Sequence, residues 1–175
     1  MELFDLLKKR RSVRKYTEKK IEKEKLEKLL QAAMLAPSGH AFYPLQFIVI
    51  EDPEMLKKMA VMRSTGSAKM LEGAAAAIVI LGDTEKSDMW SEDASIAAEN
   101  IYLAAEDLGL GTCWIQGRER NYDENTSTDA YLRCLLGYPE NVQLECTMSI
   151  GYAAAHAPEK DPGELDYSKV HYEKY

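Results

Sequence analysis

The stretch 91–108 constrains the fold more than any other part of this sequence. Its apolar residues recur at helical spacing and form one nearly continuous stripe, made of Ala94, Ala97, Ala98, Ile101, Ala104, Ala105 and Leu108. Gly109 then stands where a glycine commonly ends a helix. Because alanine has so little bulk, we expect a long helix that lies close to another backbone. That backbone belongs either to a central sheet or to the same helix of a second subunit.

Two short apolar runs predict the sheet. Residues 45–50 and 76–81 are continuous and rich in β-branched side chains, which is typical of strands buried on both faces. Weaker patterns predict strands at 112–116 and 145–152, and helices at 3–7, within 21–37, from Pro53 to about Met62, and at 129–136. Strands alternate with helices, so we expect an α+β or α/β architecture with one mixed sheet covered by helices.

The composition is that of an ordinary globular chain. With 175 residues, 46% of them hydrophobic, residues 1–175 are expected to form one domain, with a polar tail from about residue 157. The cysteines Cys113, Cys134 and Cys146 are odd in number and widely spaced, so we expect no disulfide framework, no metal site and a cytoplasmic location. No signal peptide is recognisable, and no apolar run approaches the ~20 residues that cross a bilayer, so no membrane partner is expected.

Charge is distributed unevenly. The net charge is −7, yet residues 1–28 hold 11 basic and 6 acidic residues, which gives this segment +5 and the rest of the chain −12. An acidic body opposes a long polyanion, so we expect no nucleic-acid partner, whereas a local basic cluster suits one small anion. Residues 19–28 alternate lysine with glutamate and also fit a solvated helix face. That alternative is weaker for residues 8–15.

Within this basic segment, the strongest candidate site is formed by Arg10, Arg11, Ser12 and Arg14. Guanidinium groups present planar, permanently charged donors that suit a phosphate better than lysine does. In an extended segment Ser12 and Arg14 would point to the same side. The same pattern also occurs at solvated helix ends, so on its own it leaves both interpretations open.

Other motifs are less specific. The sequence GLGTCW at 109–114 superficially matches a dinucleotide-binding loop, but it lacks the third glycine and follows a helix instead of a strand. Cys113 lies in a predicted buried strand, which favours a core thiol over a nucleophile. His40 could contact a substrate or cap a loop. Trp114 and Tyr43 could be core residues or could stack on a ligand.

Several segments in a fixed order carry a resemblance to a known family. RRSVRKY, then LAPSGHAFYPLQFIVI, then GLGTCWI, with a final HYEKY, resemble the signature of the FMN-dependent nitroreductases over essentially the whole chain. The resemblance implies an α+β, three-layer α/β/α fold with a central mixed, mainly antiparallel sheet. It also implies a homodimer whose interface forms two flavin sites, each built from both subunits.

The resemblance also assigns site residues. Arg10, Ser12 and Arg14 match positions that bind the flavin phosphate, ribityl chain and ring edge, with Arg11 assisting. The loop that the partner subunit lays against the isoalloxazine is matched by Pro37, Ser38 and Gly39. Further cofactor-binding positions are Lys69, Ile115, Gln116, Gly117 and Lys160.

This sequence departs from the family pattern in three places. The usual asparagine and glutamine of the second motif are Ala41 and Tyr43, so we expect His40, Phe42 and Tyr43 to form an unusual substrate site. Gly66 replaces the asparagine commonly found three residues before Lys69. The basic cluster near the C-terminus is reduced to Lys160.

The implied activity is that of an FMN-dependent oxidoreductase. It would take hydride from NADH or NADPH and reduce a small electron-poor acceptor, such as a nitroaromatic or a quinone, by a ping-pong mechanism. The flavin carries the chemistry, so no catalytic acid or base is assigned, and Arg14 and Lys69 are candidates for stabilising the reduced cofactor. The departures motivate an alternative, a non-redox protein of the same fold that binds flavin or another phosphorylated ligand.

Overall fold

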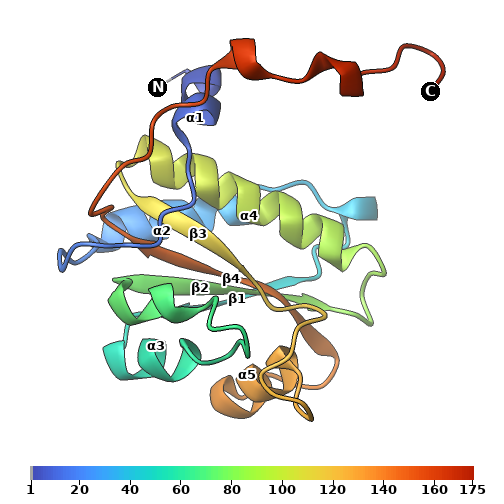
Figure 1. Cartoon of the computed structure of the whole chain (residues 1–175). Helices are drawn as coiled ribbons and strands as arrows, with labels where there is room; N and C mark the ends of the chain where they lie inside the picture. Colours follow the sequence, from blue (N-terminus) through green and yellow to red (C-terminus); the bar gives the residue numbers. More distant parts are fainter. Residues whose placement is uncertain (1) are drawn as a thin grey trace.

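The computed structural model describes residues 2–175 and contains one antiparallel sheet (Figure 1). Its four strands have the order β1-β2-β4-β3 and span Leu45–Ile50 (β1), Ala76–Asp83 (β2), Gly111–Gln116 (β3) and Val142–Gly151 (β4). Within residues 2–175, the one parallel pairing is an isolated bridge between Ser12 and Thr112, outside the four strands. The expected mainly antiparallel sheet is therefore confirmed.

Helices cover both faces of the sheet. They are α1 (Leu3–Lys9), α2 (Lys23–Met34), α3 (Pro53–Met59), α4 (Trp90–Asp107) and α5 (Thr128–Leu136). Figure 1 shows α2 and α4 on one side and α3 and α5 on the other. Because side chains alternate along a strand, Ile78 and Ile80 of β2 join the core under α2 and α4, whereas Val79 and Leu81 join the core against α3. The three-layer α/β/α arrangement is confirmed.

The alanine stripe of α4 packs inside its own chain. Ala94, Ala97, Ala98 and Ala105 are fully buried in the core that α4 shares with α2 and the sheet. Gly109, with φ of +71°, follows the helix end as predicted. The central sheet, together with α2, is thus the backbone that the small side chains approach.

Some sequence expectations were wrong in detail. Among residues 2–175, β1 pairs with β2 alone and is an edge strand. It is not buried on both faces: Gln46 is exposed and Phe47 is half-buried. The helix expected to reach Met62 ends at Met59: Ala60 N still donates to Leu56 O (2.9 Å), but Met62 N donates to Met59 O (3.0 Å), the spacing of a 3-10 turn and not of an α-helix. Residues 8 and 9 belong to α1, so the basic loop begins at Arg10.

The N-terminal basic segment lies along the outer edge of β3. Val13 N donates to Thr112 O (3.0 Å), which covers part of this otherwise open strand edge. The contact requires a glycine at position 111, since a Cβ there would lie only 2.6 Å from Val13 Cγ2. The close approach brings the arginines of the basic segment to the sheet.

Residues 157–175, here called the C-terminal arm, extend away from the body past α1 (Figure 1). The arm is attached at its beginning, where Lys160 N donates to Lys8 O (3.0 Å) and Arg11 Nη1 donates to Pro158 O (3.0 Å). All of its residues are exposed in the single chain. In the described part of the chain, no helix is long and apolar enough to span a membrane.

Candidate functional site

Tyr102 of α4 organises the basic segment. The Arg10 guanidinium carbon lies 4.7 Å from the centre of the Tyr102 ring, and Ser12 Oγ lies 3.5 Å from the Tyr102 hydroxyl. The same hydroxyl accepts a hydrogen bond from Trp114 N (2.6 Å), on the outer edge of β3. Burial raises the pKa of Tyr102, which keeps its phenol neutral. One buried tyrosine therefore fixes Arg10 and Ser12 relative to β3.

Next to this segment is a pocket of about 220 Å³, here called the Arg14 pocket. Its lining residues are Arg14, Arg63, Ser67, Met70, Cys113, Trp114, Ile115 and Gln116. Of the predicted cofactor positions, it brings together Arg14, Ile115 and Gln116. Burial raises the pKa of the Cys113 thiol, as expected of a core cysteine and not of a nucleophile.

The end of β3 is held rigidly. The Gln116 amide is fixed at both ends, since its Oε1 accepts from Trp114 Nε1 (2.8 Å) and its Nε2 donates to Arg118 O (3.1 Å). Gly117 N donates to Glu145 O (3.0 Å), and a Cβ at Gly117 would lie 2.2 Å from Leu144 Cδ2. A side chain at position 117 would push this turn away from β4, which explains the glycine.

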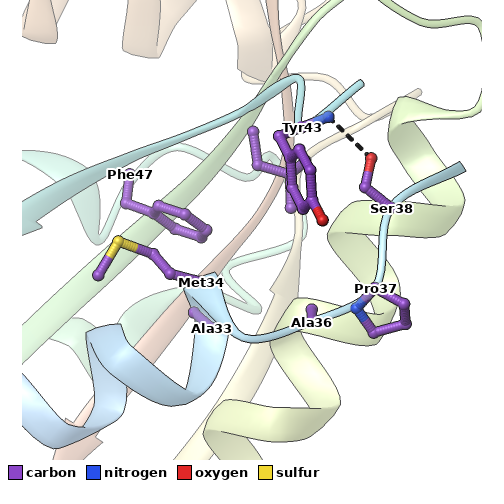
Figure 2. A pocket seen from close by; sticks show the side chains of 8 residues that line it. Ala33, Met34, Ala36, Pro37, Ser38, Tyr43 and Phe47 are labelled. Atoms are coloured by element: carbon purple, nitrogen blue, oxygen red, sulfur yellow. Dashed lines mark hydrogen bonds between the residues drawn. The ribbon is translucent and has the colours of Figure 1, made fainter. Parts of the chain in front are cut away.

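The predicted partner-facing loop lines a separate pocket of about 180 Å³ (Figure 2). Asp93 of α4 is buried and holds the start of this loop, because its carboxylate accepts from Ser38 Oγ (2.5 Å) and from Gly39 N (3.0 Å). Figure 2 shows Ser38 Oγ in turn accepting from Tyr43 N, at 2.9 Å. The pocket is lined by Ala33, Met34, Ala36, Pro37, Ser38, Tyr43, Leu45 and Phe47.

The loop carries backbone strain. His40, Ala41 and Tyr43 have φ values of +50°, +57° and +47°, a left-handed conformation that costs a non-glycine residue about 1–3 kcal/mol. The expected substrate residues His40 and Phe42 are on this loop, with ring centres 5.5 Å apart. His40 and Tyr43 are exposed. In residues 2–175 no hydrogen bond is formed by the His40 ring, so its role as a loop cap is not supported.

The remaining predicted residues lie elsewhere. Lys69 is exposed at the start of the 3-10 turn η2 (Lys69–Gly73) and does not line the Arg14 pocket, although its neighbour Met70 does. Lys160 is fixed beside α1 by its main chain and lines another pocket, with Phe4 and Leu7. The Arg14 pocket and the loop pocket share no lining residue. Within one chain, the predicted site is therefore divided.

Sequence reasoning missed three residues of these sites, namely Arg63, Asp93 and Tyr102. Asp93 could have been found, because it is an acidic residue next to Ala94 of the apolar stripe of α4. In the structure it is only 3% exposed. Tyr102 lies beside the same stripe. Arg63 stands in an irregular segment after α3, and nothing in its local sequence marks it.

Comparison with known proteins identifies the family. The model of the nitroreductase family matches residues 7–62 and 51–152. Together these ranges cover most of the chain and include both pockets. The chain belongs to the nitroreductase family.

Relatives within the nitroreductase family match nearly the whole chain. An FMN-dependent nitroreductase from Clostridium difficile R20291 has 47% identity and a TM-score of 0.97, over 99% of this chain and 100% of that one. A protein of Archaeoglobus fulgidus, provisionally named NADH dehydrogenase/NAD(P)H nitroreductase, is 43% identical over 95% of this chain and 94% of its own length. The NADPH:FMN oxidoreductase from Vibrio harveyi, solved with NAD+, has 26% identity and a TM-score of 0.83, over 98% of this chain and 77% of that one.

Proposed function

We propose that this nitroreductase-family protein is an FMN-dependent oxidoreductase that takes hydride from NAD(P)H and reduces a small electron-poor acceptor, such as a nitroaromatic or a quinone. The observation that carries the proposal is the basic segment held on the edge of β3, directly beside the Arg14 pocket. The names of the relatives from Clostridium difficile and Vibrio harveyi support FMN and a nicotinamide donor.

The residues present fit a flavin mononucleotide. Arg10, Arg11, Ser12 and Arg14 supply guanidinium groups and a hydroxyl, the donor set that a phosphate prefers. Lys160 adds a further cation near Arg11, because the C-terminal arm is attached there. The Arg14 pocket adds an apolar floor from Met70, Trp114 and Ile115, which suits a flat ring.

In the proposed site, the residues of the chain bind the cofactor and orient it. When bound, FMN supplies the hydride chemistry between donor and acceptor. Arg10, Arg11 and Ser12 would hold its phosphate, and Arg14 would lie at the edge of the ring. The main chain of residues 115–117 would lie beside the ring, held in place by the Trp114–Gln116–Arg118 hydrogen bonds. Donor and acceptor would use one open face in turn, so we propose ping-pong kinetics.

We further propose that the protein works as a homodimer and that the loop at residues 37–43 of the partner subunit completes each site. Three observations support this. The loop pocket is separate from the Arg14 pocket, and at about 220 Å³ the latter is smaller than the roughly 300–1,000 Å³ of ordinary ligand sites. Large apolar side chains are also exposed on the C-terminal arm and on α1, including Phe4 (77%), Tyr167 (70%) and Tyr172 (85%).

We also propose a cytoplasmic location. Cys113, Cys134 and Cys146 are free thiols, which fits a reducing compartment. Secretion of the native protein in an oxidising environment would contradict this proposal.

Spectroscopy and kinetics test the function together. The purified protein should be yellow and should bleach when NADH or NADPH is added without oxygen. Initial rates with a nitroaromatic or a quinone should give parallel double-reciprocal lines, as a ping-pong mechanism requires. Flavin binding without NAD(P)H oxidation would favour the non-redox alternative, and failure to bind added FMN would refute the proposed activity.

A further inference from the structure

Arg63 enters the Arg14 pocket from the irregular segment between α3 and η2. Its Nη1 donates to Gln116 O (2.8 Å), the outward-facing carbonyl at the end of β3. This bond uses one of the five N–H donors of a guanidinium group. No carboxylate of residues 2–175 forms an ion pair with Arg63. Most of its hydrogen-bonding capacity therefore remains available to a ligand.

A second arginine stands close to Arg63. Ser64 N donates to Asn121 O (3.0 Å), which joins the main chain next to Arg63 to the main chain next to Arg120. Burial, and then the positive charge of Arg120, lower the pKa of Arg63. Arg63 nevertheless stays charged at neutral pH, as arginine does in proteins.

The neighbouring Arg118, in contrast, is paired with carboxylates of its own chain. Its guanidinium lies 2.9 Å from the buried Glu145 carboxylate and 3.2 Å from that of Glu119, so its charge is neutralised. Arg120 Nη1 instead donates to a main-chain oxygen, Glu119 O (2.9 Å). The chain has 29 acidic and 22 basic residues, yet none of the ion pairs within residues 2–175 involves Arg63 or Arg120. Two like charges held together without a counter-charge repel each other, and a bound anion would remove that cost.

We propose that Arg63, which lines the Arg14 pocket, and Arg120 of the neighbouring segment form a binding subsite for an oxyanion on a reactant that approaches the bound flavin. The inference rests on the proposed function, because it assigns this anion to a reactant of the flavin site. A planar carboxylate or a phosphate matches the guanidinium fork, while the apolar part of the same molecule would lie against the flavin ring that occupies the Arg14 pocket. The oxyanion has two sources, the carboxylate of an aromatic acceptor and the phosphates of the nicotinamide dinucleotide.

Titration calorimetry measures ligand affinity directly and so tests the subsite without requiring turnover. The probes are 4-nitrobenzoate and its neutral counterpart 4-nitrobenzamide, titrated into the protein as purified. We expect Arg63→Gln and Arg120→Gln each to weaken 4-nitrobenzoate binding by about 10-fold or more, the loss of a charge-assisted hydrogen bond, and to leave 4-nitrobenzamide unchanged. Added salt should weaken binding of the benzoate alone.

Matched variants separate this role from a structural one. Lys28→Gln removes one positive charge from the exposed face of α2, on the other side of the sheet, and should change neither affinity. Arg120→Gln keeps the test valid if Arg63→Gln disturbs β3, because the Arg120 guanidinium donates to Glu119 O and the bond to Gln116 O comes from Arg63. Arg63→Lys keeps the charge but loses the fork, so it should restore only part of the affinity.

Kinetics identify the source of the anion. A raised KM for 4-nitrobenzoate alone assigns the subsite to the acceptor, and a raised KM for NADH or NADPH assigns it to the donor. If both arginine variants bind and turn over all four compounds like the unmodified protein, the subsite is refuted while the proposed function stands. A protein that binds no FMN refutes the proposed function, and calorimetry with 4-nitrobenzoate then still decides whether the arginines bind an anion.

Discussion

At the scale of single residues, Arg14 connects the basic segment to the pocket beside it. Its Nη1 donates to Ser12 O (3.3 Å), and its side chain lines the Arg14 pocket. We expect Arg14→Ala to weaken FMN binding by about 1.5–3 kcal/mol, because one charge-assisted hydrogen bond is lost. This corresponds to a rise of about 10- to 150-fold in the Kd measured by flavin fluorescence.

The control for Arg14 is Lys28→Ala, which removes an exposed charge from α2 and should leave the Kd unchanged. An unaltered Kd in Arg14→Ala would show that the basic segment does not hold the cofactor.

A second residue-scale prediction concerns acid stability. Glu22 accepts a hydrogen bond from the Tyr152 hydroxyl (2.5 Å), and this bond and Lys19 lower the pKa of Glu22 from 4.5 to about 2. A folded-state pKa below the ordinary value stabilises the fold above about pH 4.5, and the stabilisation disappears as the pH falls toward 2. Tyr152→Phe should therefore have a lower Tm than the unmodified protein at neutral pH.

The difference between the two Tm values should shrink between pH 4.5 and 2. A thermal-denaturation series across this range measures it, with Tyr172→Phe, a change on the exposed C-terminal arm, as the control. A constant difference across this range would exclude Glu22 as its source.

The predictability of the site also differs from residue to residue. Arg10, Ser12 and Arg14 were predicted because they lie within five residues of one another and the family resemblance assigns them roles, whereas the pattern alone also fitted a solvated helix end. Arg63 and Tyr102 were not, since each acts through a partner at a distant position: Arg63 bonds Gln116 and Tyr102 bonds Trp114. Such pairs exist only once the sheet has formed.

At the scale of elements, the loop at residues 38–43 depends on α4. Its three left-handed residues are held by hydrogen bonds that end on the buried Asp93 carboxylate. Asp93→Asn leaves a single acceptor oxygen for two donors, so we expect a loss of about 1–3 kcal/mol in the free energy of unfolding. For a chain of this size the Tm should fall by about 2–4 °C per kcal/mol.

Faster proteolysis within residues 38–43 should accompany the loss of stability in Asp93→Asn. The matched control is Asp88→Asn, an exposed residue just before α4, which should change neither quantity. If Asp93→Asn is as stable and as protease-resistant as the control, the loop is held by other contacts.

The elements themselves were largely predictable. β1 was located at its observed bounds and α4 within one residue, because continuous apolar runs and a 3.6-residue stripe are strong local signals. Two errors had tertiary causes. The exposure of β1 follows from its place at the sheet edge, and the segment after α3 is held by a distant residue, since the Thr128 hydroxyl donates to Met62 O.

At the scale of the whole molecule, the C-terminal arm is the segment that fits poorly with a solitary chain. Its apolar side chains, Leu165, Tyr167, Val170 and Tyr172, are exposed, while the core beneath α4 is closed without them. We expect deletion of residues 157–175 to convert a dimer into a monomer and to release the flavin. Light scattering after size-exclusion chromatography measures the change.

Circular dichroism should show that the shortened chain keeps its helices and strands. A shortened chain that remains a dimer and stays yellow would mean that the arm is dispensable for assembly.

The two pockets of one chain share no lining residue, so in the proposed homodimer complementary defects should lie in different halves of each site. Arg14→Ala damages one half and Asp93→Leu the other, and a hybrid of the two polypeptides has one centre with both lesions and one with neither. Random exchange makes about half of the dimers hybrids, so at an FMN concentration too low to fill the damaged sites, mixing the two preparations should recover about a quarter of the unmodified activity.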